Sequence, residues 1–293
     1  MDAQSKIIDA VRPGKPFYSL EFFPPREASA RPEFFKVVET LRALNPLFVS
    51  VTYGAGGGSR SNTLEIASRL AGLDLITMTH LTCVGADPDS IHEYLAELEA
   101  AGIRNILALR GDPPKDREIR REDCVFTYAS DLVSFVHREF PSFGIGVAAY
   151  LTPHPESPSF AEDRRHTALK LNAGSDFAVT QLFFDSREYF EYTDRMRALG
   201  IDKPIVPGVL PVQSMELLRR VLQLSGCSIP AKLYLALEEA DRKGGVQKVR
   251  EAGAVHAVEQ IRLLLDGGAP GIHLYTLNKA DLCLRIVEEV GPL

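Results

Sequence analysis

The sequence predicts a (β/α)8 barrel, and three observations lead to this fold class. Eight short runs rich in Val, Ile, Leu, Phe or Tyr follow one another along the 293 residues, most of them bounded by Gly, Pro or Asn. The runs are almost continuously apolar, as are strands of a parallel sheet that is covered on both faces. Helix-like stretches lie between them. Eight such units match one barrel domain over residues 1–293, and an open doubly wound sheet is the alternative.

The predicted strands share this apolar composition and lie at residues 18–23, 47–52, 75–81, 105–110, 145–150, 177–184, 204–210 and 271–277. Helices are predicted at 39–44 and at 90–102, where apolar residues recur at helical spacing and Gly102 suits a C-cap. Two more helical patterns precede the last strand and are divided at Lys243-Gly244-Gly245. The second of them carries an apolar stripe that we expect to face the barrel, made of Val246, Val249, Val255, Val258, Ile261 and Leu265.

The composition narrows the functional class. A net charge of −6 gives no reason to expect nucleic acid or an anionic membrane as a partner. The four cysteines are widely spaced without a CxxC pair, which favours buried free thiols over a disulfide framework or a zinc site. The first residues lack the apolar centre of a signal peptide, and no apolar stretch reaches the ~18 residues of a membrane span. We expect a cytoplasmic protein.

Polar residues stand at or just beyond the end of almost every predicted strand. In a barrel of this class, the chemistry takes place at the C-terminal ends of the strands. A purely structural barrel would need few polar groups there. The residues are Glu21, Thr52, His80 with Thr82, Arg110-Gly111-Asp112, Tyr150 followed by His154, Gln181, Gly208 with Pro211, and Tyr275 with Asn278.

Glu21 is an ionisable residue inside the apolar run SLEFFPPR (19–26). The two prolines extend the backbone before them and so fix the direction of the glutamate side chain. Neighbouring phenylalanines exclude water, which raises the pKa of a carboxyl group and suits it to act as a general acid. A buried glutamate paired with an arginine is the alternative, and the pattern favours neither.

Two other segments have a structural and a functional interpretation. Asp112 precedes two prolines, which is typical of a turn, and as a site residue it would place a fixed negative charge beside a bound ring. The segment 53–63 contains four glycines after a predicted strand, but it lacks both the GxGxxG spacing and the lysine of a phosphate loop. A flexible turn is therefore favoured over an anion cradle for that segment.

Nine motifs occur in one order between about Ser19 and Leu277: SLEFFPPR, FVSVTYGAGGGSR, HLTCVGADPD, ILALRGDPP, YASDLV, VAAY followed by HPE, FAVTQLFFD, GVLPV and GIHLYTLNKA. This series resembles the 5,10-methylenetetrahydrofolate reductases of the short bacterial type. The resemblance implies a flavoprotein barrel in which FAD takes a hydride from NADH or NADPH. The hydride then passes to the methylene carbon of the folate in a ping-pong reaction. It also implies a homo-oligomer.

The resemblance also assigns roles to single residues. Glu21 matches the catalytic acid that protonates N10 and opens the imidazolidine ring, and Asp112 matches an acidic residue beside flavin and folate. The implied cofactor-binding residues are Thr52, His80, Arg110, Gly111, Asp112, Tyr128, Ala129, Tyr150, His154, Asp163 and Lys170. The implied substrate-binding residues are Glu21, Gln181, Met215, Tyr275 and Lys279, with Met215 in place of a stacking phenylalanine.

Four positions depart from the family pattern near the implied cofactor site. Leu151 and Thr152 replace a Pro-Glu pair, and His166 and Leu169 stand where a polar and a basic residue are common. Loss of a cation near phosphates predicts weaker FAD binding. The choice between NADH and NADPH stays open. So does an alternative, a folate-linked barrel that works by direct nicotinamide hydride transfer or by methyl transfer. A non-catalytic folate-binding relative would carry damaged catalytic positions, which this sequence does not have.

Overall fold

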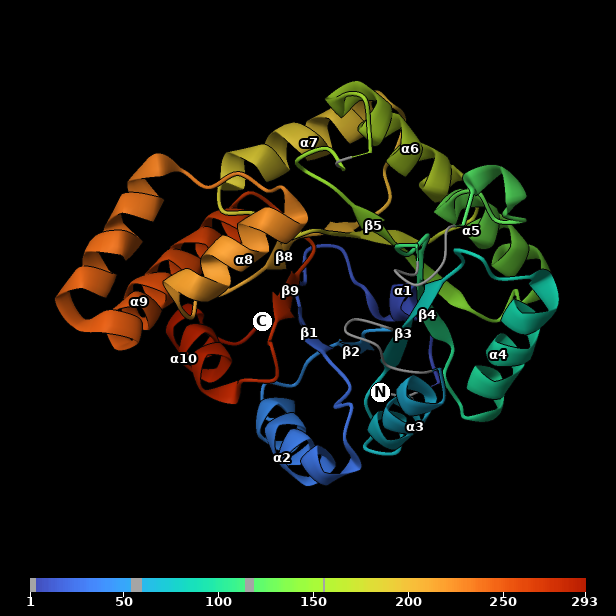
Figure 1. Ribbon diagram of the computed structural model, residues 1–293, viewed down its shortest axis with the longest axis horizontal. Helices are drawn as coiled ribbons and strands as arrows, with labels where there is room; N and C mark the ends of the chain where they lie inside the picture. Colours follow the sequence, from blue (N-terminus) through green and yellow to red (C-terminus); the bar gives the residue numbers. More distant parts are fainter. Residues whose placement is uncertain (1–3, 54–59, 114–118, 155) are drawn as a thin grey trace.

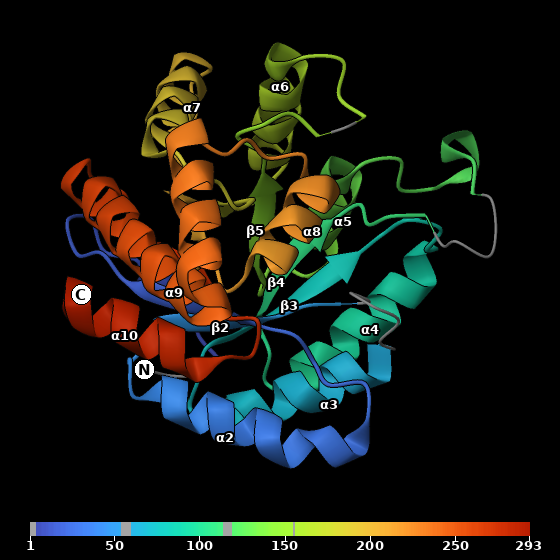
Figure 2. The ribbon, with the colours of Figure 1, turned by 60° about the vertical axis from the view of Figure 1, so that its left-hand side comes forward.

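The computed structural model describes residues 4–53, 60–113, 119–154 and 156–293. Its strands form one curved parallel sheet with helices around the outside, and Figures 1 and 2 show this arrangement from two sides. The glycine-rich residues 54–59 lie outside the described ranges, so neither interpretation of that segment is tested. No helix of the described ranges is long and apolar enough to cross a membrane.

Each predicted strand is present, and the seventh is divided in two by Pro207. The strands are β1 (Tyr18–Phe22), β2 (Phe48–Val51), β3 (Thr77–Thr82), β4 (Asn105–Leu109), β5 (Gly144–Ala149), β6 (Phe177–Thr180), β7 (Ile205–Val206), β8 (Gly208–Val209) and β9 (Ile272–Tyr275). Proline has no N–H to donate to a ladder, which explains the break inside the seventh run.

The divided seventh strand closes the barrel. Neighbouring strands follow the order β7-β6-β5-β4-β3-β2-β1-β9-β8, so β7 and β8 stand at opposite ends of the series. Pro207 joins them directly, and its carbonyl accepts a hydrogen bond from the His273 N–H at 2.9 Å. One short run therefore contacts both β6 and β9. The predicted barrel is confirmed, and the open doubly wound alternative is wrong.

The helices stand between the strands. The α-helices are α1 (Ile7–Ala10), α2 (Arg31–Arg42), α3 (Arg60–Ala71), α4 (Pro88–Ala100), α5 (Ala129–Glu139), α6 (Phe160–Asn172), α7 (Ser186–Ala198), α8 (Met215–Ser225), α9 (Ala231–Asp266) and α10 (Ala280–Val290). Two short 3-10 helices are η1 (Ala28–Ala30) and η2 (Arg121–Asp123). The helix predicted at 90–102 corresponds to α4, whose N-cap Asp87 accepts a hydrogen bond from the Ser90 N–H.

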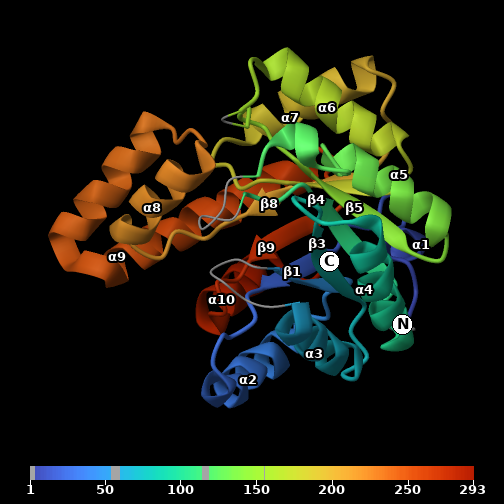
Figure 3. The same ribbon diagram turned by 45° about the vertical axis from the view of Figure 1, so that its right-hand side comes forward.

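The long helix α9 kinks at Gly244 and Gly245, where the sequence predicts a break. Figure 3 shows α8 and the first half of α9 projecting to one side of the barrel. The predicted apolar stripe is partly wrong, because Val246 and Val255 are exposed. Val249, Val258 and Ile261 of the stripe are buried. Small residues share the buried face, and at Gly253 the approach is close, because a Cβ there would lie 2.3 Å from the Val212 carbonyl oxygen.

The interior of the barrel changes from apolar to polar along its axis. Alternate residues of each strand face inward. One end is filled by an apolar cluster that includes Phe17, Phe48, Met78, Leu107 and Phe177. Further along the same strands, buried polar residues follow in the same alternation, namely Ser19, Glu21, Ser50, Thr52, His80 and His273. The polar end is therefore the C-terminal end of the strands, where the sequence predicts the site.

Candidate active site

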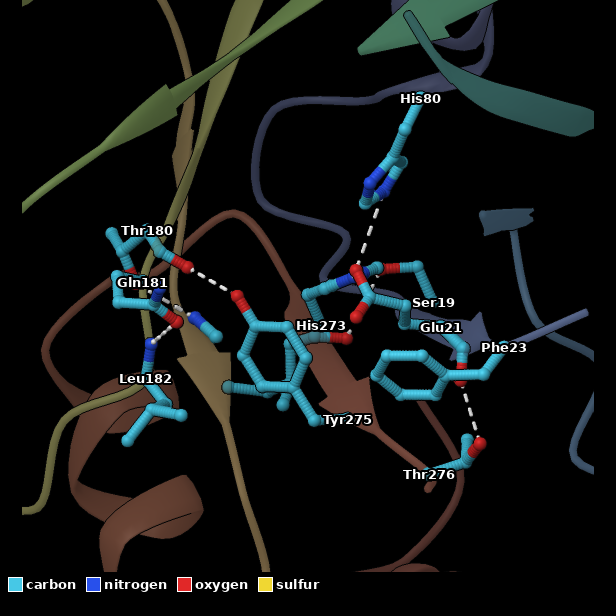
Figure 4. A network of polar contacts seen from close by, with 12 residues as sticks. Ser19, Glu21, Phe23, His80, Thr180, Gln181, Leu182, His273, Tyr275 and Thr276 are labelled. Carbon is cyan, nitrogen blue, oxygen red and sulfur yellow. Dashed lines mark hydrogen bonds and ion pairs between the residues drawn. The ribbon is translucent and has the colours of Figure 1, made fainter. Parts of the chain in front are cut away.

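Glu21 lies between two histidines at the end of β1. Glu21 is only 6% exposed. Its Oε2 atom lies 3.3 Å from His80 Nε2 on β3 and 3.6 Å from His273 Nε2 on β9 (Figure 4). The partners are histidines rather than the arginine of the alternative interpretation. A carboxylate between two imidazoles can exchange a proton with either ring.

The backbone around Glu21 is held by the turn that follows β9. The Thr276 hydroxyl donates to the Glu21 carbonyl at 2.6 Å. Asn278 bonds both ways with Phe23, accepting from its N–H at 3.0 Å and donating to its carbonyl at 2.7 Å. These bonds tie the end of β1 to the end of β9. They complement the two prolines after Phe23 in fixing where the glutamate points.

His273 belongs to this group although the sequence analysis did not single it out. Its Nδ1 lies 2.8 Å from the Ser19 hydroxyl, its ring stacks on Phe48 at 5.8 Å, and it is 1% exposed. It was missed because it lies in the middle of a predicted strand rather than at its end. The signal is the register: Ser19 pairs with His273, and Glu21 pairs with Tyr275, so polar side chains alternate on facing strands.

The histidines change the charge state predicted for Glu21. Burial alone raises the pKa of its carboxyl group, but the close contacts with the His273 and His80 rings more than offset this effect and lower the pKa to about 2. The prediction of a raised pKa is therefore wrong. The error arose because the neighbours in sequence are phenylalanines, while the neighbours in space are imidazoles.

The lowered pKa predicts how stability depends on pH. A carboxyl group with a depressed folded-state pKa stabilises the fold above its unfolded value of about 4.3, and this contribution is lost as the pH falls toward the folded value. As the pH falls from about 5 to about 3, we expect the free energy of unfolding of wild type to decrease relative to that of Glu21→Gln. Urea denaturation at each pH measures it. A difference that stays constant over this range would contradict the ionised carboxylate.

A cavity of about 400 Å³ lies next to this group, between the ends of β4 and β5 and helices α5 and α6. The implied cofactor residues from Arg110 to Lys170 all line it: Arg110, Gly111, Asp112, Tyr128, Ala129, Tyr150, His154, Asp163 and Lys170. His166 and Leu169 also line it. Thr52 and His80 do not line this cavity: they are buried at the ends of β2 and β3, where His80 contacts Glu21. The structure thus brings together the implied cofactor residues from Arg110 to Lys170, and the role of all of them in binding stays a prediction.

Buried charges inside this cavity have few partners. The Lys170 ammonium group donates to the Ala148 carbonyl, and burial lowers its pKa to about 8, with Asp163 acting in the opposite direction. Burial also raises the pKa of Asp163, whose Oδ1 accepts from the His154 N–H while Oδ2 has no partner among the described residues. Buried polar groups in this state are typical of a site that takes a polar ligand.

Other groups of the cavity offer flat surfaces and positive charge. The Tyr128 ring lies 5.9 Å from His166, and the Lys170 ammonium lies 5.8 Å from the Tyr150 ring. Arg110 forms two hydrogen bonds of 2.6 Å with Glu156. Gly111 has a φ of +83°, and a Cβ there would lie 2.8 Å from Thr82 Cβ, so this turn requires glycine. Aromatic rings beside cations suit a ligand that carries both a ring system and phosphates.

The implied substrate residues are not all at the mouth of the barrel. Tyr275 pairs with Glu21 across β1 and β9, and in Figure 4 it lies between Glu21 and Gln181. Met215 is 3% exposed and lies in an apolar cluster with Leu182 and Leu218, against which Tyr275 also packs, and its contact with a substrate stays a prediction. Lys279 is exposed at the start of α10. No group of three or more His, Cys, Asp or Glu within the described ranges is arranged to hold a metal ion.

Comparison with known proteins identifies the family. A family model described as methylenetetrahydrofolate reductase matches residues 6–291. The chain belongs to the methylenetetrahydrofolate reductase family. Two bacterial 5,10-methylenetetrahydrofolate reductases are similar over nearly their whole length. That of Escherichia coli (strain K12) is 36% identical over 99% of this chain and 95% of its own. That of Pectobacterium carotovorum subsp. carotovorum is 37% identical over 93% and 89%.

Some eukaryotic relatives are longer than this chain. Methylenetetrahydrofolate reductase 1 of Schizosaccharomyces pombe is 34% identical over 100% of this chain but only 49% of its own length, so this chain spans about half of that relative. A solved structure of an uncharacterized protein from Clostridium thermocellum, described as binding two copies of 5-methyl-5,6,7,8-tetrahydrofolic acid, matches with a TM-score of 0.67. It is 14% identical and covers 96% of both chains, which supports the barrel fold alone.

Proposed function

We propose that this protein reduces 5,10-methylenetetrahydrofolate to 5-methyltetrahydrofolate, using NADH or NADPH as electron donor and FAD as bound cofactor. The observation that carries the proposal is the buried Glu21 between His80 and His273, next to a cavity with aromatic walls and cations. Family membership supplies the substrate class. We further propose that the whole chain acts as one catalytic domain. The homo-oligomer implied by the resemblance stays a prediction.

The cavity residues fit FAD by their chemistry. Tyr128 and Tyr150 offer ring surfaces, and Lys170 offers positive charge for phosphates, while the Arg110 guanidinium is paired with Glu156. The orphan Oδ2 of Asp163 offers an acceptor for a hydroxyl group. When bound, the flavin supplies two-electron chemistry by accepting and returning a hydride. Arg164 pairs with Glu191 and Arg165 with Glu162, and neither lines the cavity, so they do not replace the cation missing at Leu169.

Glu21 supplies the proton that the ring opening requires. Breaking the bond between N10 and the methylene carbon leaves an iminium carbon that accepts a hydride, and N10 gains one proton. The two imidazoles lower the pKa of Glu21, so we propose that the carboxylate receives this proton from His80 or His273 and passes it to N10. Folate binding excludes water from the mouth of the barrel. The loss of water destabilises the charged form of the Glu21 carboxyl group. Among the described residues, the buried hydroxyl groups of Ser50 and Thr52 have no hydrogen-bond partner. Both hydroxyl groups are therefore available to bind the ligand.

The proposed reaction is tested by product analysis. Purified protein with FAD, NADH or NADPH and 5,10-methylenetetrahydrofolate is expected to consume the nucleotide and to form 5-methyltetrahydrofolate in equal amounts, as measured by mass spectrometry. Folate-independent consumption of the nucleotide alone, without the methyl product, would contradict the proposal.

Substitution of Leu169 gives a second test of the cofactor site. Its side chain lines the cavity and is 51% exposed, at the position where the resemblance leads us to expect a basic residue. We expect Leu169→Arg to lower the Kd of FAD by about 2- to 5-fold, because a partly exposed ion pair contributes about 0.5–1 kcal/mol. Calorimetric titration of the FAD-free protein measures it, with the uncharged Leu169→Gln as control. Equal Kd values for the two variants at low salt would place the phosphates elsewhere.

A further inference from the structure

The Tyr275 side chain on β9 reaches past the divided strand of the barrel, and its hydroxyl group bonds to β6. The ladder between β6 and β7 pairs Ala178 with Ile205 and Val179 with Val206, and it stops at Pro207. If the ladder continued, the Gly208 N–H would donate to the Thr180 carbonyl. It donates instead to the Thr180 hydroxyl at 2.8 Å. The released carbonyl accepts the Tyr275 hydroxyl, also at 2.8 Å.

Gly208 makes this contact possible. A Cβ on Gly208 would lie 2.5 Å from the Thr180 carbonyl oxygen and 2.6 Å from Tyr275 Cε2, so any other residue would displace the ring. Burial, followed by the charge of Glu21, raises the pKa of Tyr275 well above its usual value, which keeps the hydroxyl protonated as a donor. The hydroxyl is thus committed to a backbone carbonyl.

The carbonyl that Tyr275 holds belongs to the peptide that precedes Gln181. The other end of this peptide, the Gln181 N–H, donates to the Ala149 carbonyl at 2.7 Å. The peptide plane is therefore held from both sides, which fixes the direction in which the Gln181 side chain leaves the backbone. The side-chain oxygen Oε1 then accepts the Leu182 N–H at 3.0 Å (Figure 4). Because the amide oxygen is occupied in this way, the Nε2 group remains to donate.

We propose that Tyr275 is a positioning residue for folate recognition: it acts through Gln181, so that this side chain presents N–H donors to an acceptor atom of the pterin ring. The inference rests on the proposed function, because it takes the folate as the ligand at the barrel mouth. It deepens the role of Tyr275, whose hydroxyl donates to the Thr180 carbonyl. The Tyr275 ring also packs edge-on against His273 at 5.4 Å, which places it beside the Glu21 group.

A double-mutant cycle tests this role. The variants are Tyr275→Phe, Gln181→Ala and both together, and the readouts are the KM and Kd for folate, kcat, and the rate of flavin reduction by the nucleotide. Tyr275→Phe keeps the ring and removes one hydrogen bond, worth about 1 kcal/mol. We expect a folate KM about 5- to 10-fold higher, kcat and flavin reduction within about 2-fold, and no further rise in KM when Gln181 is already alanine.

Tyr189→Phe is a matched control. The Tyr189 hydroxyl donates to the Ile205 carbonyl of the same divided strand at 2.8 Å, away from the barrel mouth. We expect Tyr189→Phe to lower Tm by about as much as Tyr275→Phe does, because each variant loses one hydrogen bond to a backbone carbonyl. We expect the folate KM of Tyr189→Phe to stay unchanged. An equal KM change in both variants, or the same Tyr275→Phe effect with and without Gln181, would overturn the inference.

The cycle also separates the inference from the proposed reaction. Calorimetric Kd values for 5-methyltetrahydrofolate do not require turnover. Wild-type protein that binds this folate without forming product contradicts the proposed reaction, while the cycle on Kd still decides the role of Tyr275. Wild-type protein that binds no reduced folate overturns both.

Discussion

Glu21→Gln is expected to slow the oxidation of reduced flavin by 5,10-methylenetetrahydrofolate by about 10²–10⁴-fold, the usual effect of removing a positioned general acid. Glutamine has almost the same shape but cannot deliver a proton to N10. The reduction of the flavin by the nucleotide needs no acid at this position, so we expect its rate to stay within a few-fold of wild type. Anaerobic stopped-flow absorbance measures each half-reaction separately.

Glu27→Gln is the control for this variant. Glu27 is exposed and lies six residues after Glu21, just beyond the same strand. Glu27→Gln removes the same charge but leaves the two histidines untouched. We expect the rates of both half-reactions to remain unchanged. If Glu21→Gln instead slowed both half-reactions equally and lowered Tm, Glu21 would be a structural residue whose buried charge organises the barrel mouth.

Lys170→Met is expected to weaken FAD binding by about 10- to 100-fold. The Lys170 ammonium group is buried beside the cavity, and hydrogen bonds to charged groups contribute about 1.5–3 kcal/mol. Methionine fills a similar volume, but it supplies neither charge nor a donor. Titration of the FAD-free protein, followed by flavin absorbance or calorimetry, measures the change in Kd.

Arg165→Met is the matched control for Lys170→Met. Arg165 lies on the same helix, but its side chain is 70% exposed and pairs with Glu162 outside the cavity. We expect its FAD affinity to match that of wild type at moderate salt. Equal losses in the two variants would mean that the cofactor phosphates lie along the outer face of α6 rather than inside the cavity.

The barrel could be predicted from the sequence because each of its units carries a local signal. Apolar runs mark the strands, and the polar residues at their ends mark one rim. These signals act over a few residues, and the fold class requires only that they repeat. The break in the seventh strand at Pro207 was not predicted, because the apolar run 204–210 reads as one strand.

The charge state of the site could not be predicted in the same way. Glu21 and His273 are separated by 252 positions, and they meet only because β1 pairs with β9 when the barrel closes. Local sequence shows phenylalanines around Glu21, which predicts a raised pKa, whereas the facing strand supplies an imidazole. Met215 shows the same limit, since its burial depends on the cluster beneath α8 rather than on its own neighbours.

The central claim is that this barrel carries hydride to folate through a bound flavin beside Glu21. The most direct test is the visible spectrum of the purified protein after incubation with FAD, recorded anaerobically during addition of nucleotide and then of 5,10-methylenetetrahydrofolate. We expect flavin bands that bleach with NADH or NADPH and return when the folate is added. A colourless protein that nevertheless forms 5-methyltetrahydrofolate would contradict the flavin route and would favour direct hydride or methyl transfer.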